Sequence, residues 1–404
     1  MHTPAACPSA HAIPTPRHRA GLLTDLDRRR IGWLRLVLVL ALVFLHYGGI
    51  YGSDLSPYRG YQGQALPIAS ILISFILYVG FTAVPAMSAI SGYLFFLGAD
   101  RDTPPDFATK MRRRVHSLLV PCVIWGTGFA ALGLLVHLAV PSAFATFFAG
   151  PGQPVVAFVN AALGITRNPL AFQLWFVHDL IVTVAISPLV WFLIGRLPWI
   201  TIAVLVPLWI LGVDTVVFHR LDVLIFFCFG AACAMHGLRP DLPRWLILPV
   251  FVGFLAVAMA RTLAPWYIGR TAGLDLDIAT AAMRVLGALA VWNVAALLLE
   301  GRFADWVERN AYMAFFIHCA HYPPILFLKL GLGAFIDPAS EIMQLALYLA
   351  TVSLTIWGCV VAGRLLAIRA PGTFRTLSGG RTAPGGRTAA GFLPTAQPGS
   401  AARR

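Results

Sequence analysis

The chain has 404 residues, of which 58% are hydrophobic and only 12% are charged, and its mean hydropathy is +0.77. A soluble domain is closer to half apolar and a quarter charged, so this composition excludes a soluble globular protein and places most of the chain in lipid. The formal net charge of +13 reflects membrane topology and contact with anionic lipids, and not nucleic-acid binding.

The sequence predicts an all-α integral membrane protein with about ten transmembrane helices, because apolar runs long enough to cross a bilayer core recur along it. A long segment between spans, 141–172, is itself apolar and is expected to lie on the membrane or to cap the bundle. In chain order the predicted spans are 31–50, 69–98 (broken at Pro85), 115–140, 173–195, 198–216, 221–236, 244–262, 280–300, 312–334 and 342–368.

The positions of the cations predict that both termini are cytoplasmic. Most of the 30 Lys and Arg residues lie in the two terminal segments and in every second loop, which is the pattern of cytoplasmic segments. An even number of spans requires the same arrangement. Residues 1–30 are polar and basic and are predicted to be a disordered tail. Residues 369–404, rich in Gly, Pro, Ala and Arg, are predicted to be a flexible cytoplasmic tail, which leaves 31–368 as the membrane domain.

Two ionisable residues share the first span. Arg35 and His46 are eleven residues apart, so on a helix they lie on one face, about 16 Å apart along the axis. Arg35 is expected near the cytoplasmic end and His46 near the outer end. Ionisable groups inside a span usually mark function. The alternatives are that Arg35 snorkels to the inner interface and that His46 is a polar residue close to the outer surface.

The stretch "QLWFVHDLI", residues 173–181, begins the fourth span at its outer end. Asp179 in this stretch is expected at a depth similar to that of His46. A carboxylate that orients and charges an imidazole makes it a better general base, so Asp179 and His46 are predicted to act together. The alternative is a structural ion pair between Asp179 and His178 or another cation.

The stretch "FFIHCAHYPPI", residues 315–325, carries His318 and His321 on one helix face, and Pro323 and Pro324 are expected to break the helix directly afterwards. No cluster of Cys, Asp or Glu accompanies the two histidines, so no metal site is expected. A hydrogen-bonding role in a polar cavity is the favoured interpretation.

The stretch "ATKMRRRVHSLLVP", residues 108–121, places several cations at the cytoplasmic mouth of the third span. They are either ordinary stop-transfer charges or a phosphate cradle, since arginine binds phosphate bidentately. The nearby stretch "VPAMSAISGYLFF", residues 84–96, contains a proline and a Ser-Gly pair inside a span. Broken helices of this kind are tolerated in membranes where they line a cavity.

Together these motifs resemble the acyltransferase 3 family of integral membrane acyltransferases, in particular the branch that O-acetylates bacterial surface polysaccharides. The chain departs from the family pattern at Phe81-Thr82, His178 and His318. The motif residues, in family order, are Arg35 and His46; Val84, Pro85, Ser91, Gly92, Tyr93 and Leu94; Lys110, Arg113, Arg114, Ser117, Pro121 and Trp125; Leu174, Trp175, Phe176, Asp179 and Leu180; Phe315, Phe316, Ile317 and His321; and residues 376–381.

The resemblance implies a multi-pass enzyme of the bacterial inner membrane. It would transfer an acyl group, usually acetyl, from cytoplasmic coenzyme A to a hydroxyl, often of a sugar facing the periplasm. Acyl-CoA is then the donor substrate, and no bound cofactor is expected. Arg35 with Lys110, Arg113 and Arg114 would hold the coenzyme A phosphates.

Within this reaction, the positions of the residues predict that His46, charged and aligned by Asp179, deprotonates the acceptor hydroxyl near the outer side. A transient acyl-His46 and direct transfer both remain open. A donor must also stabilise the tetrahedral oxyanion. The candidates for the oxyanion or for substrate contact are Ser91, Tyr93, Trp175, His178, His318 and His321.

The competing class is a transporter or flippase that moves an acylated or lipid-linked sugar with a His/Asp proton relay. Many secondary transporters carry inverted internal repeats, and the sequence shows no such repeat. The ordered motifs also favour the enzyme.

Overall fold

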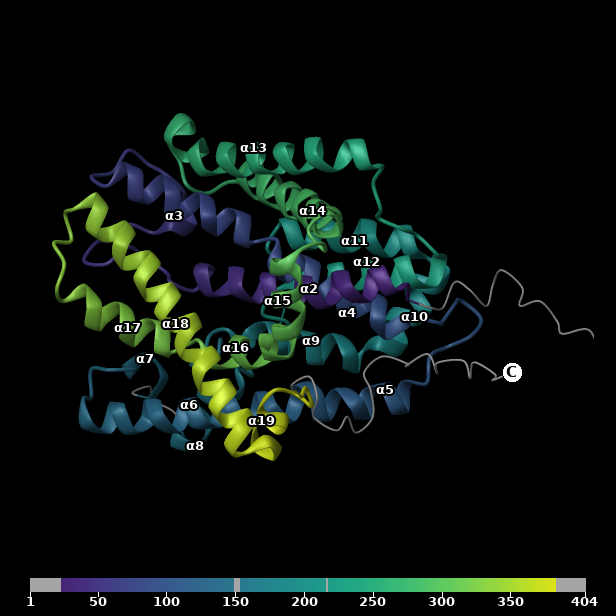
Figure 1. The fold of residues 1–404 in the computed structure, drawn as a ribbon, viewed down its shortest axis with the longest axis horizontal. Helices are drawn as coiled ribbons and strands as arrows, with labels where there is room; N and C mark the ends of the chain where they lie inside the picture. The colour runs from purple at the N-terminus through teal and green to yellow at the C-terminus, as the bar shows by residue number, and fades with distance from the viewer. Residues whose placement is uncertain (1–22, 149–152, 216, 383–404) are drawn as a thin grey trace, which may run out of the picture.

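The computed structural model describes residues 23–148, 153–215 and 217–382, which form a bundle of helices without a β-strand (Figure 1). α2 (Asp25–Leu45) runs through the middle of the bundle and contacts α3 (Pro67–Gly80) and α4 (Ala83–Phe96). The remaining helices are α5 (Phe107–Arg114), α6 (Val120–Ala139), α7 (Ala145–Phe148), α8 (Pro154–Leu163), α9 (Leu174–Ala185), α10 (Ser187–Arg196), α11 (Pro198–Ile210), α12 (Leu221–His236), α13 (Arg244–Ile268), α14 (Leu274–Leu297), α15 (Arg302–Asn310), α16 (Ala314–Ala320), α17 (Pro324–Gly333), α18 (Glu341–Arg369) and α19 (Pro371–Leu377).

The predicted polytopic helical membrane protein is confirmed, and every predicted span is helical over much of its length. Within the described residues, five helices are long and apolar enough to cross a membrane, and up to seven if each bent pair counts as one span. The prediction of about ten therefore exceeds this count by three to five. α11 and α12 are shorter apolar helices, and α2 begins with a highly charged turn.

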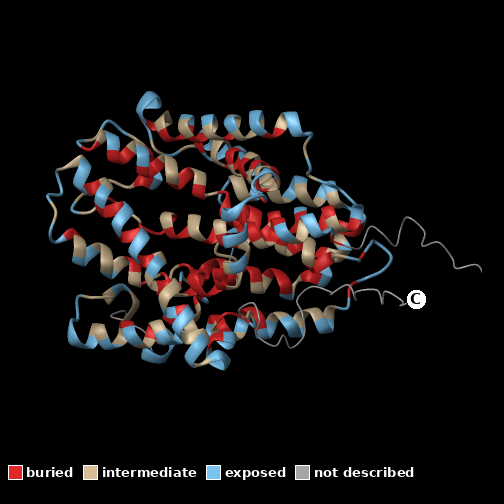
Figure 2. Cartoon of the chain, viewed as in Figure 1, coloured by how far each residue is buried: buried red, intermediate tan, exposed pale blue. Residues whose placement is uncertain are grey.

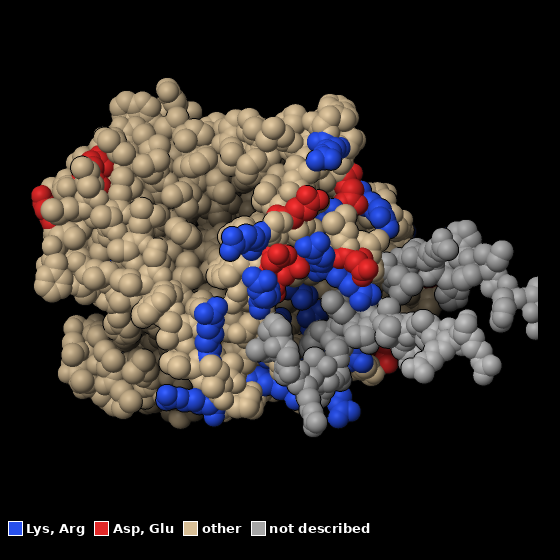
Figure 3. Space-filling model, viewed as in Figure 1, with Lys and Arg blue, Asp and Glu red and all other residues tan. Residues whose placement is uncertain are grey.

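The outer surface of the bundle is apolar, as a lipid-facing surface requires. Figure 2 shows the buried residues concentrated in the central helices, while the peripheral α13, α6 and α18 expose much of their length. Large apolar side chains are among the exposed residues, including Trp245 of α13 and Trp357 of α18. On the face shown in Figure 3, Lys and Arg side chains gather toward the end where α2 starts. Which side of the membrane this end faces stays a prediction.

The prediction of a disordered segment over 1–30 is wrong for its last residues, because α2 already begins at Asp25. Thr24 caps the helix by accepting a hydrogen bond from the Asp27 amide, and the acidic first turn is favourable at a helix N-terminus. Arg30 is buried and pairs with Asp241 at 2.6 Å, which ties this turn to the bundle. The rest of the predicted tail, 1–22, lies outside the described residues.

The predicted flexible tail over 369–404 is also helical at its start, because α19 packs against α18 and α6. Phe374 is buried there, and the Trp125 indole N–H donates to the Leu377 carbonyl at 3.2 Å. The chain then turns through Gly379, whose φ of +67° favours glycine. Residues 383–404 lie outside the described residues.

The predicted break of the second span occurs slightly before Pro85. α3 ends at Gly80 and α4 begins at Ala83, so Pro85 sits in the first turn of α4, where proline is tolerated. Proline has no amide hydrogen to donate to the carbonyl four residues earlier, which is that of Phe81. The helix is therefore interrupted at Phe81, and this residue lines the cavity described below.

A second proline perturbs the third span in the same way. Residues 115–119 form one π-helical turn between α5 and α6, with the Val120 amide bonded to the Val115 carbonyl. Pro121 cannot donate to the Ser117 carbonyl, and the wider turn accommodates its ring. Gly379 of the tail lies so close to the Ser117 carbonyl oxygen that a β-carbon at this position would overlap it.

The described residues of the apolar segment 141–172 pack against α6, and its placement on the membrane or as a cap of the bundle stays a prediction. α7 and α8 lie beside α6 (Figure 1), and they bury a small apolar cluster against it that includes Ala130, Ala161 and Leu170.

The closest helix–helix packing joins α4 and α12, and two glycines allow it. A β-carbon at Gly92 would overlap the Phe227 carbonyl, and one at Gly230 would overlap the Ala89 carbonyl. Small residues let helix backbones approach closely in membranes. Gly92 of the predicted Ser-Gly pair thus has a packing role.

We expect Gly230→Ala to destabilise the protein by on the order of 1–3 kcal/mol, because the added methyl forces α4 and α12 apart. The control is Gly253→Ala in α13, where a β-carbon would meet nothing within 4 Å. Thermal unfolding of the detergent-purified variants measures both. Equal melting temperatures for the two variants would contradict the packing argument.

Candidate active site

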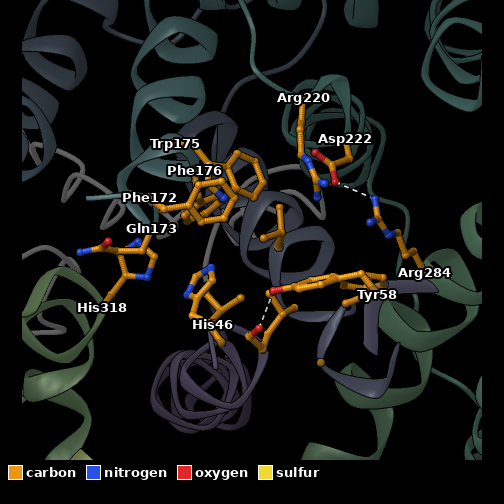
Figure 4. A pocket seen from close by; sticks show the side chains of 15 residues that line it. His46, Tyr58, Phe172, Gln173, Trp175, Phe176, Arg220, Asp222, Arg284 and His318 are labelled. Carbon is orange, nitrogen blue, oxygen red and sulfur yellow. Dashed lines mark hydrogen bonds and ion pairs between the residues drawn. The ribbon is translucent and has the colours of Figure 1, made fainter. Parts of the chain in front are cut away.

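A cavity of about 70 Å³ lies at the point where several helix ends meet, and His46 forms part of its wall (Figure 4). His46 directly follows the last residue of α2, and the first turns of α9 and α12 open onto the same space. The site is therefore assembled from segments far apart in the sequence. The lining residues are Leu42, Leu45, His46, Tyr58, Gly80, Phe81, Val84, Phe172, Gln173, Trp175, Phe176, Arg220, Asp222, Arg284 and His318.

The partner of His46 is His321, and not Asp179. His46 Nδ1 lies 2.8 Å from His321 Nε2, and the two rings are stacked with an interplanar angle of 13°. On its other side, His321 Nδ1 lies 3.0 Å from the Ile317 carbonyl oxygen. A carbonyl oxygen only accepts, so His321 carries its proton on Nδ1 and offers an unprotonated Nε2 to His46. His46 therefore donates from Nδ1, which leaves its Nε2 with a free lone pair at the cavity.

The bend that positions His321 is held by Gln173. Pro323 cannot donate to the Cys319 carbonyl four residues earlier, and the predicted break is confirmed, since the α15–α16 segment and α17 meet at 71°. The Gln173 side-chain amide donates to the Cys319 carbonyl at 2.7 Å and to the Tyr322 carbonyl at 2.9 Å. These two carbonyls lie on either side of His321 in the chain.

His318 lines the cavity one helical turn from His321. Both of its ring nitrogens are buried and have no hydrogen-bond partner among the described residues. Its ring contacts the Phe176 ring edge-on, with centroids 5.8 Å apart. A buried imidazole without a partner is costly, so His318 is available to a bound group.

Two arginines face the cavity in different states (Figure 4). Arg284 is paired with Asp222 at 2.9 Å, and both side chains are nearly buried. Arg220 instead stacks over the Trp175 ring, with its guanidinium carbon 5.1 Å from the ring centroid. No ion pair joins Arg220 to a carboxylate among the described residues. Arg220 is therefore a fixed positive charge that a ligand can use.

The prediction that Asp179 orients His46 is not met by the geometry, because Asp179 uses its carboxylate elsewhere. Oδ1 accepts from the His219 amide at 2.9 Å and lies 3.1 Å from His178 Nδ1. Oδ2 accepts from the Arg220 amide at 2.8 Å. The contact between Asp179 and His178 agrees with the alternative interpretation, in which the two residues form a structural pair. Asp179 acts on the cavity only by fixing the backbone that carries Arg220.

A second cluster of functional groups lies around Arg35. Arg35, Arg114 and Arg381 come together there, and no carboxylate pairs with any of the three among the described residues. Burial, and then the charges of Arg35 and Arg114, lower the pKa of Arg381. Three cations that repel one another without a counter-ion form a site for an anion.

The arginine cluster, as these three residues are called below, connects to the cavity through a series of side chains. The Arg381 guanidinium carbon lies 4.8 Å from the Phe315 ring centroid. The Phe315 ring in turn neighbours His318, with centroids 6.4 Å apart. His318 neighbours His321 at 6.0 Å, and His321 stacks on His46 at 5.0 Å.

The other two predicted phosphate ligands lie in different surroundings. The Lys110 ammonium donates to the Phe95 and Leu97 carbonyls at the end of α4, so it acts as a helix C-cap. Arg113 is exposed. The structure thus groups only Arg114 of the predicted run with Arg35.

The oxyanion candidates on α4 lie away from His46. Tyr93 lines a separate, larger cavity together with Trp292 and Arg239. Ser91 does not line the His46 cavity. Of the six predicted substrate or oxyanion residues, only Trp175 and His318 line it directly, while His321 contacts His46 from behind and His178 contacts Asp179.

Several residues of these sites had no assigned role in the sequence, and three of them show which signals were missed. Arg381 closes the loosely matching segment 376–381, and this motif was the signal that could have identified it. Arg220 lies in the short loop between the predicted spans 198–216 and 221–236, and such an isolated cation was a weak signal. Gln173 opens the "QLWFVHDLI" stretch, and nothing in that position indicated its contacts with the α16–α17 bend.

Comparison with known proteins identifies the family. A family profile described as "Acyltransferase domain" matches residues 28–364. The chain is also 28% identical over 297 residues to the succinoglycan biosynthesis protein ExoH of Rhizobium meliloti (strain 1021), and this similarity covers 73% of the chain and 77% of the relative. No solved structure matches. Since the matched profile takes in most of a polytopic helical chain, the chain belongs to the acyltransferase 3 family of integral membrane acyltransferases.

Proposed function

We propose that the protein is an O-acyltransferase of the bacterial inner membrane, which moves an acetyl or similar acyl group from cytoplasmic acyl-CoA to a hydroxyl of an envelope carbohydrate. The observation that carries this proposal is the chain from Ile317 through His321 to His46, which leaves His46 Nε2 as a proton acceptor at a cavity. Membership of the family supports acyl transfer. The name of the relative, a succinoglycan biosynthesis protein, supports a glycan acceptor.

His46 acts as the general base in this mechanism. Its Nε2 takes the proton of the acceptor hydroxyl while the hydroxyl oxygen attacks the thioester carbonyl carbon. His321 accepts a hydrogen bond from His46 Nδ1 and so keeps Nε2 in the required tautomer and stabilises the imidazolium that forms. As the C–S bond breaks, the proton passes to the coenzyme A thiolate. Attack by Nε2 on the thioester, to give a transient acyl-His46, uses the same lone pair and stays the alternative.

The cavity supplies groups for the oxyanion of the tetrahedral intermediate. Among the described residues, Arg220 provides a positive charge without a carboxylate partner, and His318 provides ring nitrogens without a hydrogen-bond partner. Preorganised donors of this kind are worth most where water is excluded. Asp179 then serves as a positioning residue, because its Oδ2 holds the Arg220 backbone amide.

The arginine cluster is the proposed site for the coenzyme A phosphates. Arg35 and His46 lie about 16 Å apart along α2, and the series of side chains from Arg381 to His318 runs between the two sites. The donor would place its phosphates at the cluster and extend its thioester arm along this series. The structure supports Arg35 and Arg114 in this role more strongly than Lys110 and Arg113.

The geometry gives less support to the alternative hypothesis that the protein is a transporter or flippase. A His/Asp proton relay needs a carboxylate close to His46, and Asp179 is engaged by His178 and by two backbone amides. The hydrogen-bond partner of His46 is instead the imidazole of His321.

We expect His46→Ala to lower acyl transfer by about 10²–10⁴-fold, the usual contribution of a positioned general base. His321→Ala is expected to cause a smaller loss, because the base remains but its tautomer is no longer held. Transfer from radiolabelled acetyl-CoA to envelope glycan in membranes measures both. His137→Ala is the control, since His137 bonds to the Ala143 carbonyl at 2.8 Å, away from the cavity. More than a tenth of wild-type turnover in His46→Ala would contradict the general-base role.

We expect Arg381→Ala and Arg35→Ala each to raise the donor KM about tenfold or more, because a hydrogen bond to a charged group contributes about 1.5–3 kcal/mol. Arg113→Ala is the matched control and is expected to change KM less than threefold, since an exposed charge is screened. Initial rates against acetyl-CoA concentration provide the comparison. An unchanged KM in both cluster variants would rule out the arginine cluster as the donor site.

A further inference from the structure

A second group of titratable side chains lies beside the cavity, and its one part in the proposed chemistry is that Asp179 positions Arg220. His178 and Asp179 belong to α9, and His219 belongs to the segment that precedes α12. One potential ligand atom from each residue lies within 4.8 Å of the other two. Two imidazoles and one carboxylate are a ligand set that zinc accepts.

The distances inside this cluster suit a shared metal ion. The His178 and His219 rings lie side by side, with centroids 4.6 Å apart. His178 Nδ1 and Asp179 Oδ1 are 3.1 Å apart. Two ligands bound at a tetrahedral angle to one zinc ion are about 3.3 Å apart, since Zn–N and Zn–O bonds are about 2.0–2.2 Å long. Small side-chain movements would therefore bring all three ligand atoms onto one ion.

The hydrogen bonds within the cluster leave lone pairs on His219 and Asp179 that could bind a metal ion. His219 Nε2 is buried and has no hydrogen-bond partner among the described residues, and such an orphaned nitrogen calls for an ion or a water. Asp179 Oδ2 accepts one amide hydrogen, that of Arg220, and a carboxylate oxygen has a second lone pair. The two amide bonds to Asp179 also fix its orientation, as groups around a metal ligand commonly do.

We propose that His178, Asp179 and His219 form a binding site for a divalent transition-metal ion of the zinc type. Three protein ligands leave a fourth position for water or an exchangeable ligand. The ion would bridge α9 and the segment before α12, and this segment carries Arg220 into the cavity. The site lies apart from the proposed general base, because His46 bonds to His321 and not to any of the three ligands.

The test uses the full chain, purified in detergent with an affinity tag that contains no histidine. Zinc content by mass spectrometry and a Co²⁺ titration by absorption spectroscopy measure binding. We expect about one ion per chain and the visible absorption bands of four-coordinate Co²⁺. His219→Gln and His178→Gln are each expected to weaken binding at least tenfold, since glutamine keeps a polar group of similar length but is a poor zinc ligand.

His116→Gln is the matched control, because His116 is exposed and lies on the π-helical turn, outside the cluster; it should bind like the wild type. Zn²⁺ should also raise the melting temperature of the wild-type protein in a concentration-dependent way, as any ligand of the folded state does. This second measurement applies even if the glutamine variants fail to fold. Undetectable binding by the wild type, or unchanged affinity in His219→Gln, would show a purely hydrogen-bonded cluster and overturn the proposal.

Discussion

The hydrogen bond between His46 and His321 is the interaction on which the proposed chemistry depends. An isolated imidazole exchanges between two tautomers, and only one of them leaves Nε2 free at the cavity. The Ile317 carbonyl determines the tautomer of His321, and His321 then determines that of His46. The reactivity of a residue that follows α2 is thus determined by a backbone carbonyl of α16. Any change that moves α16 relative to α2 would alter the base without touching it.

The middle and the C-terminal end of the central helix present opposite electrostatic environments. Around Arg35 the structure gathers positive charge that no carboxylate of the described residues pairs with, which suits a polyanionic carrier. Around His46 it gathers imidazoles and aromatic rings, with Arg220 as a positive charge that has no ion pair among the described residues. A helix is rigid over three turns, so the separation between these environments is constant. This constancy lets one part of a donor be held while another part reacts.

How far the sequence could predict this arrangement depends on the range of each interaction. Helical periodicity correctly placed Arg35 and His46 along one helix, and Pro323 and Pro324 correctly located a bend. The partner of His46 could not be found in this way. His321 lies 275 residues away, and depth alone did not distinguish it from Asp179. Arg381 was hidden for a different reason, because a Gly- and Arg-rich composition suggested an unfolded tail, whereas Gly379 packs against the π-helical turn.

The prolines explain why the functional groups gather where they do. Pro85, Pro121 and Pro323 each deprive a carbonyl four residues earlier of its helical partner, and in an apolar environment such carbonyls must be satisfied or sheltered. Phe81 at the first break lines the cavity. The Ser117 carbonyl at the second break lies against Gly379. The Cys319 carbonyl at the third break accepts a hydrogen bond from the Gln173 side chain. The second and third interruptions therefore each have another segment of the chain placed against the freed carbonyl, and the first opens onto the cavity. The cavity and the arginine cluster lie at these interruptions because the backbone there needs polar or closely packed neighbours, and uninterrupted transmembrane helices would have required none.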